Sequence, residues 1–478
     1  MQMIILKKQK HDEPKFDELF EMISDLKEFL DEDANPNDLL WNKNLSTILD
    51  FQDDDGSFKL FDSWKIPSDA KVDFCWVPTY ICTAILMKAY LTDPNSFPTK
   101  EKFGLLNGLK KSTGKNLWGH GFEGLKGQIE ALNIFFKAGL NEFIDFYPDF
   151  CPEFTQMIEK IIGKYQKMEL EEKFYGPWGE SYEGEIKAVN EYFCQRLVFV
   201  YGTLMSGESN HHYLKNSTCL GPAVLEGYDM YDVGWYPAIV PGNGHAIGEL
   251  YRVPIGDLPS IDRLEGEGTL YAKRCETVTD CEGNKSFALV YVYLRDVSSL
   301  ERIPAWKDYV WYVSYGSNML RERFLCYIRG GSFEGSRYRQ ACSDASLPAA
   351  VKAVEIPYDM YFGNNSGSWE NGGVSFLDTK ENGNALGVAY LITRQQFEHV
   401  AAQENGGRPP HEGYGWYESI IHLGKMDGFE VKTITNTNLR PYNEPCDAYL
   451  DTLSKGIREN WPDKSDEEIR DYLASCKR

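Results

Sequence analysis

The sequence contains no apolar run that approaches the roughly 18 residues that a helix needs to cross a bilayer. The longest candidate, Tyr80 to Leu91, is interrupted by Lys88. The first residues, Met1 to His11, place a short apolar stretch before a basic one, which is the reverse of an export signal. These absences predict a cytoplasmic protein without a membrane segment.

The spacings typical of metal sites are also missing. The eleven cysteines are scattered along the chain, and none forms a Cys-x-x-Cys pair. The eight histidines include one adjacent pair, His211 and His212, and no His-x-x-x-His. We therefore expect free thiols in a reducing compartment, no metal site and no cofactor.

Basic residues are scarce, since 50 Lys and Arg stand against 72 Asp and Glu, which gives a net charge of −22. A surface this acidic repels phosphate backbones and anionic lipids, so nucleic acid and membranes are not expected partners. Hydrophobic residues (42%) and aromatic residues (14%) are frequent enough for packed cores, which excludes a mostly disordered chain. At about 150 residues per domain, the length predicts about three domains.

The N-terminal part of the chain has the periodicity of helices. Apolar residues recur at helical spacing in four stretches: 16–30, 78–91, 125–139 and 153–168. Turns rich in glycine and aromatic residues separate these stretches, and the tryptophans of two such turns, Trp118 and Trp178, lie 60 residues apart. A period near 60 residues predicts an all-α repeat domain over residues 1–192.

One of these turns, Phe51-Gln52-Asp53-Asp54-Asp55-Gly56-Ser57-Phe58, resembles the turns of the α/α toroids of terpene cyclases and prenyltransferases. The resemblance implies helices linked into a barrel. The three aspartates could form an acidic catalytic motif, and the alternative is a helix-linking turn with capping carboxylates. His120 could likewise be catalytic or structural. The protein partner of this domain, if it has one, is unknown from the sequence.

After residue 190 the pattern changes to that of short strands. Leu197-Val198-Phe199-Val200 runs into Tyr201-Gly202-Thr203-Leu204. Trp311-Tyr312-Val313-Ser314 runs in the same way into Tyr315-Gly316-Ser317-Asn318-Met319. Both loops place a glycine directly after a strand, where the backbone can turn tightly and bring its N–H groups close to a ligand.

A second shared element follows each loop. Tyr251 precedes Glu265 by 14 residues, and Tyr390 precedes Glu404 by the same distance. A short helical stretch leads to each glutamate, and a strand that opens with an aromatic residue follows it. The chain therefore carries the same unit twice, and the extra length of the second copy is expected around residues 327–371.

These residues resemble the gamma-glutamylcyclotransferase family, including its AIG2-like and gamma-glutamylamine branches. That family has a Tyr-Gly-(Ser/Thr)-(Asn/Leu) loop after the first strand and a single glutamate after an Asp-x-x-Glu-like turn. Asp262-Arg263-Leu264-Glu265-Gly266 fits this turn, whereas the second copy has Ala401 and Asn405 in place of Asp262 and Gly266. The resemblance implies two α+β domains built on small β-barrels, over 193–305 and 306–478, the latter with C-terminal helices.

The resemblance also implies an enzyme that releases 5-oxoproline and a free amine, amino acid or peptide from a γ-glutamyl compound. Glu265 and Glu404 would be the general acid/base, and we expect a partly apolar pocket to raise their pKa. The loop N–H groups would hold the α-carboxylate or the developing oxyanion, and Asn318 could add a side-chain donor. The expected substrate-binding residues are Tyr201, Gly202, Thr203, Leu204, Tyr315, Gly316, Ser317, Asn318, Met319, Tyr271 and Tyr417.

Each assignment has an alternative. Glu267 is close enough to Glu265 to be mistaken for it, although the register between the two copies favours Glu265. The four tyrosines among the expected substrate-binding residues could instead be packing residues: Tyr201, Tyr271, Tyr315 and Tyr417. The barrels could also bind a small ligand without turnover while the helical domain recruits a partner, and the position of the two glutamates inside or outside a pocket distinguishes these hypotheses.

Overall fold

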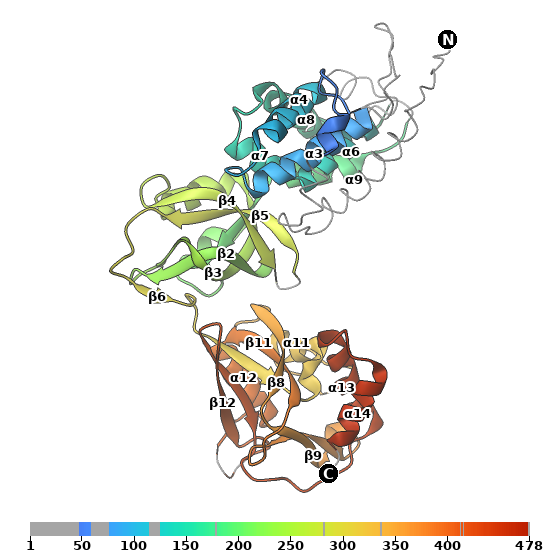
Figure 1. Ribbon diagram of the computed structural model, residues 1–478, viewed down its shortest axis with the longest axis vertical. Coiled ribbons are helices and arrows are strands. Elements are labelled where there is room, and N and C mark those ends of the chain that lie inside the picture. Colours follow the sequence, from blue (N-terminus) through green and yellow to red (C-terminus); the bar gives the residue numbers. More distant parts are fainter. Residues whose placement is uncertain are drawn as a thin grey trace.

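The computed structural model describes residues 47–58, 76–113, 125–176, 179–280, 283–334, 337–411, 413 and 415–476. A helical region is followed by two domains that contain β-barrels, which succeed one another along the long axis of the molecule (Figure 1). The helix predicted over 16–30, the turn at Trp118, residue His120 and Trp178 lie outside the described residues.

The helical region is built around α3 (Trp76–Thr92), which is buried on nearly all sides from Pro78 onward. The elements around it are η1 (Leu49–Phe51), α4 (Thr99–Ser112), α6 (Leu125–Lys137), α7 (Leu140–Phe146), α8 (Pro152–Leu170) and α9 (Glu183–Phe193). Gly108 of α4 lets the two helices approach closely, because a Cβ there would lie 2.3 Å from the Thr83 hydroxyl. The helices predicted over 78–91, 125–139 and 153–168 are confirmed.

Two turns of this region share a backbone hydrogen bond and a left-handed glycine. The Asp53 N–H donates to Ser57 O and the Gly176 N–H donates to Glu180 O, both at 2.8 Å. A glycine occupies the left-handed position of each turn, with φ of +84° at residue 56 and +87° at residue 179. The Asp55 carboxylate accepts bonds from the Ser57 N–H and hydroxyl, so it stabilises the turn itself.

The first barrel consists of β1 (Gln195–Val200), β2 (Thr218–Asp232), β3 (Pro237–Pro254), β4 (Tyr271–Asp280) and β5 (Lys285–Tyr293), with η2 (His211–Leu214), η3 (Ile255–Asp257), α10 (Leu258–Glu265) and the short β6 (Glu301–Ile303). The strand order is β3-β1-β5-β4-β2, and pairing between β2 and β3 closes the ring. Strand β1 is antiparallel to β3 and parallel to β5.

The second barrel repeats this order with β7 (Tyr309–Ser314), β8 (Ala350–Ile356), β11 (Ala385–Thr393), β12 (Ser419–Met426) and β13 (Phe429–Thr435). Its sheet runs β8-β11-β7-β13-β12, which matches β2-β3-β1-β5-β4 of the first barrel. Strand β7 is again antiparallel to its first neighbour and parallel to its second. Part of the extra length in the second copy forms a separate hairpin, of β9 (Asp359–Ser366) and β10 (Gly372–Asp378).

Helices surround the second barrel. They are η4 (Ser317–Met319), α11 (Arg321–Arg329), η5 (Gly367–Trp369), α12 (Arg394–Glu404), α13 (Asp447–Asn460) and α14 (Asp466–Ser475). The last begins with a capping box formed by Ser465 and Glu468.

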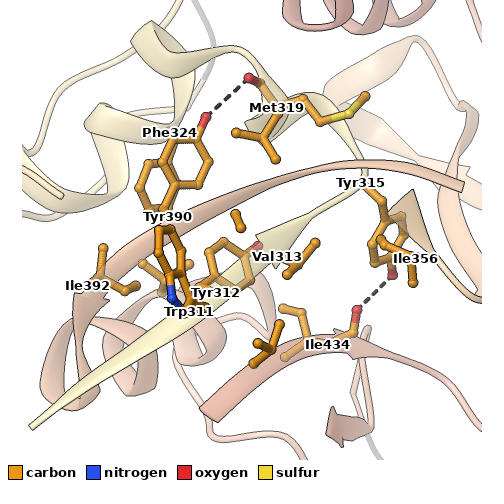
Figure 2. Packing of buried hydrophobic residues seen from close by; sticks show 14 of the residues in the cluster. Trp311, Tyr312, Val313, Tyr315, Met319, Phe324, Ile356, Tyr390, Ile392 and Ile434 are labelled. Carbon is orange, nitrogen blue, oxygen red and sulfur yellow. Dashed lines mark hydrogen bonds between the residues drawn. The ribbon is translucent and has the colours of Figure 1, made fainter. Parts of the chain in front are cut away.

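A buried tyrosine ties the first strand of each barrel to its parallel neighbour. The Tyr201 hydroxyl donates to Tyr291 O at 2.6 Å, and the Tyr315 hydroxyl donates to Ile434 O at 2.7 Å. Figure 2 shows the second of these bonds at the edge of the aromatic core of its barrel. The two barrels therefore share strand order, register and this buried contact.

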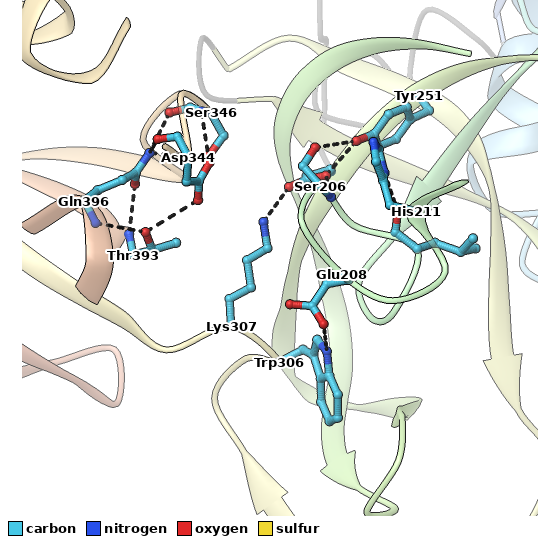
Figure 3. A network of polar contacts seen from close by, with 12 residues as sticks. Ser206, Glu208, His211, Tyr251, Trp306, Lys307, Asp344, Ser346, Thr393 and Gln396 are labelled. Atoms are coloured by element: carbon cyan, nitrogen blue, oxygen red, sulfur yellow. Dashed lines mark hydrogen bonds and ion pairs between the residues drawn. The ribbon is translucent and has the colours of Figure 1, made fainter. Parts of the chain in front are cut away.

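Side chains also connect successive domains. Arg196 of β1 pairs with Asp145 of α7 through two nitrogens, and Phe287 of β5 packs against the helical core. Between the barrels, Lys307, labelled in Figure 3, donates to buried Glu249 of β3 at 2.9 Å. Within the described ranges, no helix combines the length and apolarity that crossing a membrane requires.

Candidate active sites

Each barrel brings its Tyr-Gly loop and its glutamate to one cavity. Glu265 is the last residue of α10 and Glu404 is the last residue of α12. Each helix follows the strand that pairs antiparallel with the first strand of its barrel, so the helix end returns to the loop at the exit of that first strand. The predicted helical stretches before the two glutamates are thus confirmed.

The cavity of the first barrel is small, at about 30 Å³. The predicted residues that line it are Tyr201, Gly202, Thr203, Leu204, Glu265 and Tyr271. A volume of this size holds a water molecule and is too small for a γ-glutamyl group. The predicted residues of this barrel therefore lie together around a small site.

Glu265 is the most perturbed carboxyl group of this site. Among the described residues no hydrogen-bond donor or cation pairs with it, and burial raises its pKa from 4.5 to about 7. The predicted upward shift is confirmed for this residue, since desolvation disfavours the charged form. Its neighbour Glu267 is exposed and lies outside the cavity, which removes the ambiguity between the two.

The polar groups around Glu265 are held by the protein itself. The Tyr271 hydroxyl donates to Pro237 O at 2.7 Å, and Thr203 accepts a bond from the Asn210 amide. Asp262 binds Lys273 and the Tyr291 hydroxyl, so the aspartate of the turn supports the barrel wall. Position 202 has no room for a side chain, because a Cβ there would lie 2.7 Å from the Pro237 ring.

The cavity of the second barrel is far larger, at about 510 Å³. The predicted residues that line it are Tyr315, Gly316, Ser317, Asn318, Glu404 and Tyr417. Met319 is the exception among the predicted residues. Its side chain is fully buried in the barrel core, and its carbonyl accepts a bond from Tyr390 (Figure 2).

Asn318 and Asn405 organise the surroundings of Glu404. The Asn318 amide donates to Glu404 at 2.7 Å, so it orients the carboxylate itself. Leu204 is the residue in that position of the first loop and cannot do this. Asn405 differs from Gly266 in conformation, with φ of −104° against +61°, and its side chain bonds the Tyr417 N–H.

The backbone of both loops offers donors. In the parts of the chain that the structure describes, the N–H groups of residues 202–204 and 316–318 donate to no protein acceptor. The next N–H groups close the turn instead, from Met205 to Gly202 O and from Met319 to Gly316 O, both at 2.9 Å. Each loop therefore presents consecutive N–H groups to an oxyanion or carboxylate.

Sequence reasoning missed the arginines of the second cavity. Arg323, Arg337 and Arg339 line it, and Arg323 donates to the Ser317 hydroxyl at 2.8 Å. The only signal for them was five arginines between residues 321 and 339 in an otherwise acidic protein. No group of three or more His, Cys, Asp or Glu side chains suited to a metal comes together within the described ranges.

Comparison with known proteins relates part of the chain to a described protein family. The family model "Gamma-glutamyl cyclotransferase, AIG2-like" matches residues 198–310. The chain is 36% identical over 113 residues to the gamma-glutamylcyclotransferase family protein YtfP of Escherichia coli K12, which covers 23% of this chain and 96% of that protein. It is 30% identical over 201 residues to histone deacetylase 5 of Arabidopsis thaliana, but the match spans only 30% of that protein and 34% of this chain. Among solved structures, YkqA from Bacillus subtilis matches at 20% identity over 59% of this chain and 97% of its own, with a TM-score of 0.23.

Proposed function

The chain belongs to the AIG2-like gamma-glutamylcyclotransferase family through residues 198–310, and from this premise we propose that it cleaves γ-glutamyl compounds to 5-oxoproline and a free amine. We further propose that the second barrel is another copy of the same unit. The observation that carries the proposal is the shared arrangement of a strand-exit loop with free N–H groups and one glutamate at a single cavity in each barrel.

The proposed reaction needs one carboxylate and a folded substrate. The glutamate takes a proton from the substrate's α-ammonium group, and the free amine attacks the γ-carbonyl carbon. The new C–N bond closes a five-membered ring, and loop N–H groups stabilise the oxyanion. The glutamate then returns its proton to the leaving nitrogen as the old C–N bond breaks, and the ring nitrogen loses its second proton to the released amine, which departs as an ammonium ion. Because attack is intramolecular, holding the substrate folded supplies much of the acceleration.

The two sites favour this reaction to different extents. Glu265 has the raised pKa that suits a proton carrier near neutral pH, but its cavity has no room for a substrate. Glu404 lines a cavity of about 510 Å³, and a hydrogen bond from the Asn318 amide orients its carboxylate. We therefore expect the second barrel to supply most of the turnover, while the small volume of the first cavity favours a supporting role for that barrel.

The N-terminal region is proposed to be a toroid-like helical repeat. Its support is that the turns at 53–57 and 176–180 share a backbone bond between their first and last residues and a left-handed glycine.

The test is to incubate the full chain with γ-glutamyl dipeptides and γ-glutamylamines and to measure 5-oxoproline. Glu265→Gln and Glu404→Gln are assayed singly and together, with Glu267→Gln as the exposed control. Loss of activity in the double variant, and not in the control, supports the mechanism. Unchanged activity in the double variant would exclude it.

A further inference from the structure

The wall of the second cavity carries a positive charge that the proposed reaction does not use. Arg323 of α11 is only 5% exposed, and no carboxylate lies within ion-pair distance of it among the described residues. Its Nε donates to Ser317, which leaves the terminal nitrogens of the guanidinium without a protein acceptor in the described chain. A buried cation in this state is costly unless a ligand supplies the anion.

Two more arginines extend the same wall. Arg337 and Arg339 line the main cavity, and with Arg323 they also line a side cavity of about 200 Å³. The Arg323 guanidinium lies 5.0 Å from the centre of the Trp369 ring, and that of Arg339 lies 4.4 Å from the centre of the Tyr327 ring. Stacking of this kind fixes planar guanidinium groups in place, which prepares them to bind a carboxylate with two parallel bonds.

The local charge is opposite to that of the molecule and of the first site. The whole chain carries −22, and no Lys or Arg among the described residues lines the small cavity around Glu265. Among the described residues, Glu404, the proposed acid/base, is the one carboxylate that lines the main cavity. Glu334 and Glu370 line the side cavity, where Glu334 pairs with Lys455 at 3.0 Å. The hairpin β9–β10, which the first barrel lacks, leads into Trp369 through the turn that joins its strands. The extra segments of the second copy therefore build the positive wall.

We propose that the second barrel selects γ-glutamyl substrates whose leaving amine is anionic, and specifically an acidic amino acid with a side-chain carboxylate. This inference rests on the proposed function. The γ-glutamyl part takes the loop N–H groups and Glu404, and the departing group extends toward Arg323, Arg337 and Arg339. The positive wall offsets the repulsion that an acidic substrate meets from the rest of the protein.

Three substrates differ stepwise in the charge of the leaving amine: γ-Glu-Glu with two carboxylates, γ-Glu-Gln with one, and γ-glutamyl-n-butylamine with none. They are assayed with the full-length Glu265→Gln variant, so that turnover comes from the second barrel. We expect kcat/KM to fall in that order, by about tenfold to a hundredfold between γ-Glu-Glu and γ-Glu-Gln, as for a charge-assisted bond. Added salt should reduce the difference.

Variants decide which part of the substrate the arginines recognise. The Arg337→Gln/Arg339→Gln double variant changes one exposed and one half-buried side chain. Arg323→Lys retains the positive charge but loses the planar guanidinium group that can form two parallel bonds. Each should lower kcat/KM for γ-Glu-Glu more than for γ-glutamyl-n-butylamine. Arg329→Gln removes an exposed charge from the same helix outside the cavity and should change nothing. An equal loss for all three substrates would overturn the proposal, because the arginines would then bind the common glutamyl part.

Failure of the inference is distinguishable from failure of the proposed function. Turnover of all three substrates at equal kcat/KM contradicts the charge selection and leaves the cyclotransferase intact. Absence of 5-oxoproline from every substrate contradicts the cyclotransferase. In that case calorimetric binding of the same three compounds still tests the selection, and equal or undetectable binding of γ-Glu-Glu and γ-Glu-Gln would overturn it.

Discussion

Replacing Glu265 by glutamine should stabilise the protein at high pH and have little effect at low pH. Burial raises the pKa of this carboxyl group to about 7, from 4.5 in the unfolded chain. Between these values the folded protein binds more protons than the unfolded chain, so the free energy of unfolding decreases as the pH rises. Each pKa unit corresponds to about 1.4 kcal/mol, so the full cost above pH 7 is about 3 kcal/mol. Glutamine imitates the neutral acid and removes this cost.

Urea unfolding of the wild type, Glu265→Gln and Glu267→Gln at several pH values between 4 and 9 measures the effect. The stability of the Glu265 variant should match the wild type below pH 4.5 and exceed it increasingly up to about pH 8. Glu267 is exposed, so its variant should follow the wild type throughout. A difference between Glu265→Gln and wild type that stays constant over the whole range would refute the assignment of a buried, unpaired carboxyl group.

Three further substitutions test the geometry. Asn318→Leu copies the first loop into the second and should lower kcat about tenfold, measured as 5-oxoproline release, because the donor that orients Glu404 is lost; unchanged kcat would contradict that role. Gly202→Ala should lower stability by about 1–3 kcal/mol in thermal unfolding, since its Cβ would meet the Pro237 ring, while Gly256→Ala, in open space, should cost less than about 0.5 kcal/mol; equal effects would contradict the contact. Gly108→Ala should destabilise the helical region, because the new methyl group would clash with Thr83. Gly163→Ala, in open space on α8, is the control and should stabilise the region by about 1 kcal/mol. Both are measured by the loss of helical circular dichroism on heating, and stabilisation by both would show that α3 and α4 are not closely packed.

The sequence was most informative where function depends on short-range pattern. Tyr201, Glu265 and their counterparts Tyr315 and Glu404 stand at the ends of strands and helices, so hydrophobic periodicity and spacing were enough to pair them. The structure adds that each glutamate is the last residue of its helix and shares a cavity with the loop.

The features that could not be predicted from the sequence depend on three-dimensional packing. The orientation of Met319 differs from its neighbours because the 3₁₀ turn directs it into the core. The arginine wall joins α11 to a loop 14 or more residues further along the chain, and local pattern carries no information about that contact. The difference between cavities of about 30 and 510 Å³ likewise arises from how side chains of distant segments fill space.

The most direct test of the central claim is the rate of 5-oxoproline formation by Glu265→Gln compared with Glu404→Gln in the full chain. We expect a loss of at least about a hundredfold for Glu404→Gln and a smaller loss for Glu265→Gln, because the second cavity is large enough for a substrate and the first is not. Full activity in Glu404→Gln, or a complete loss in Glu265→Gln alone, would contradict it.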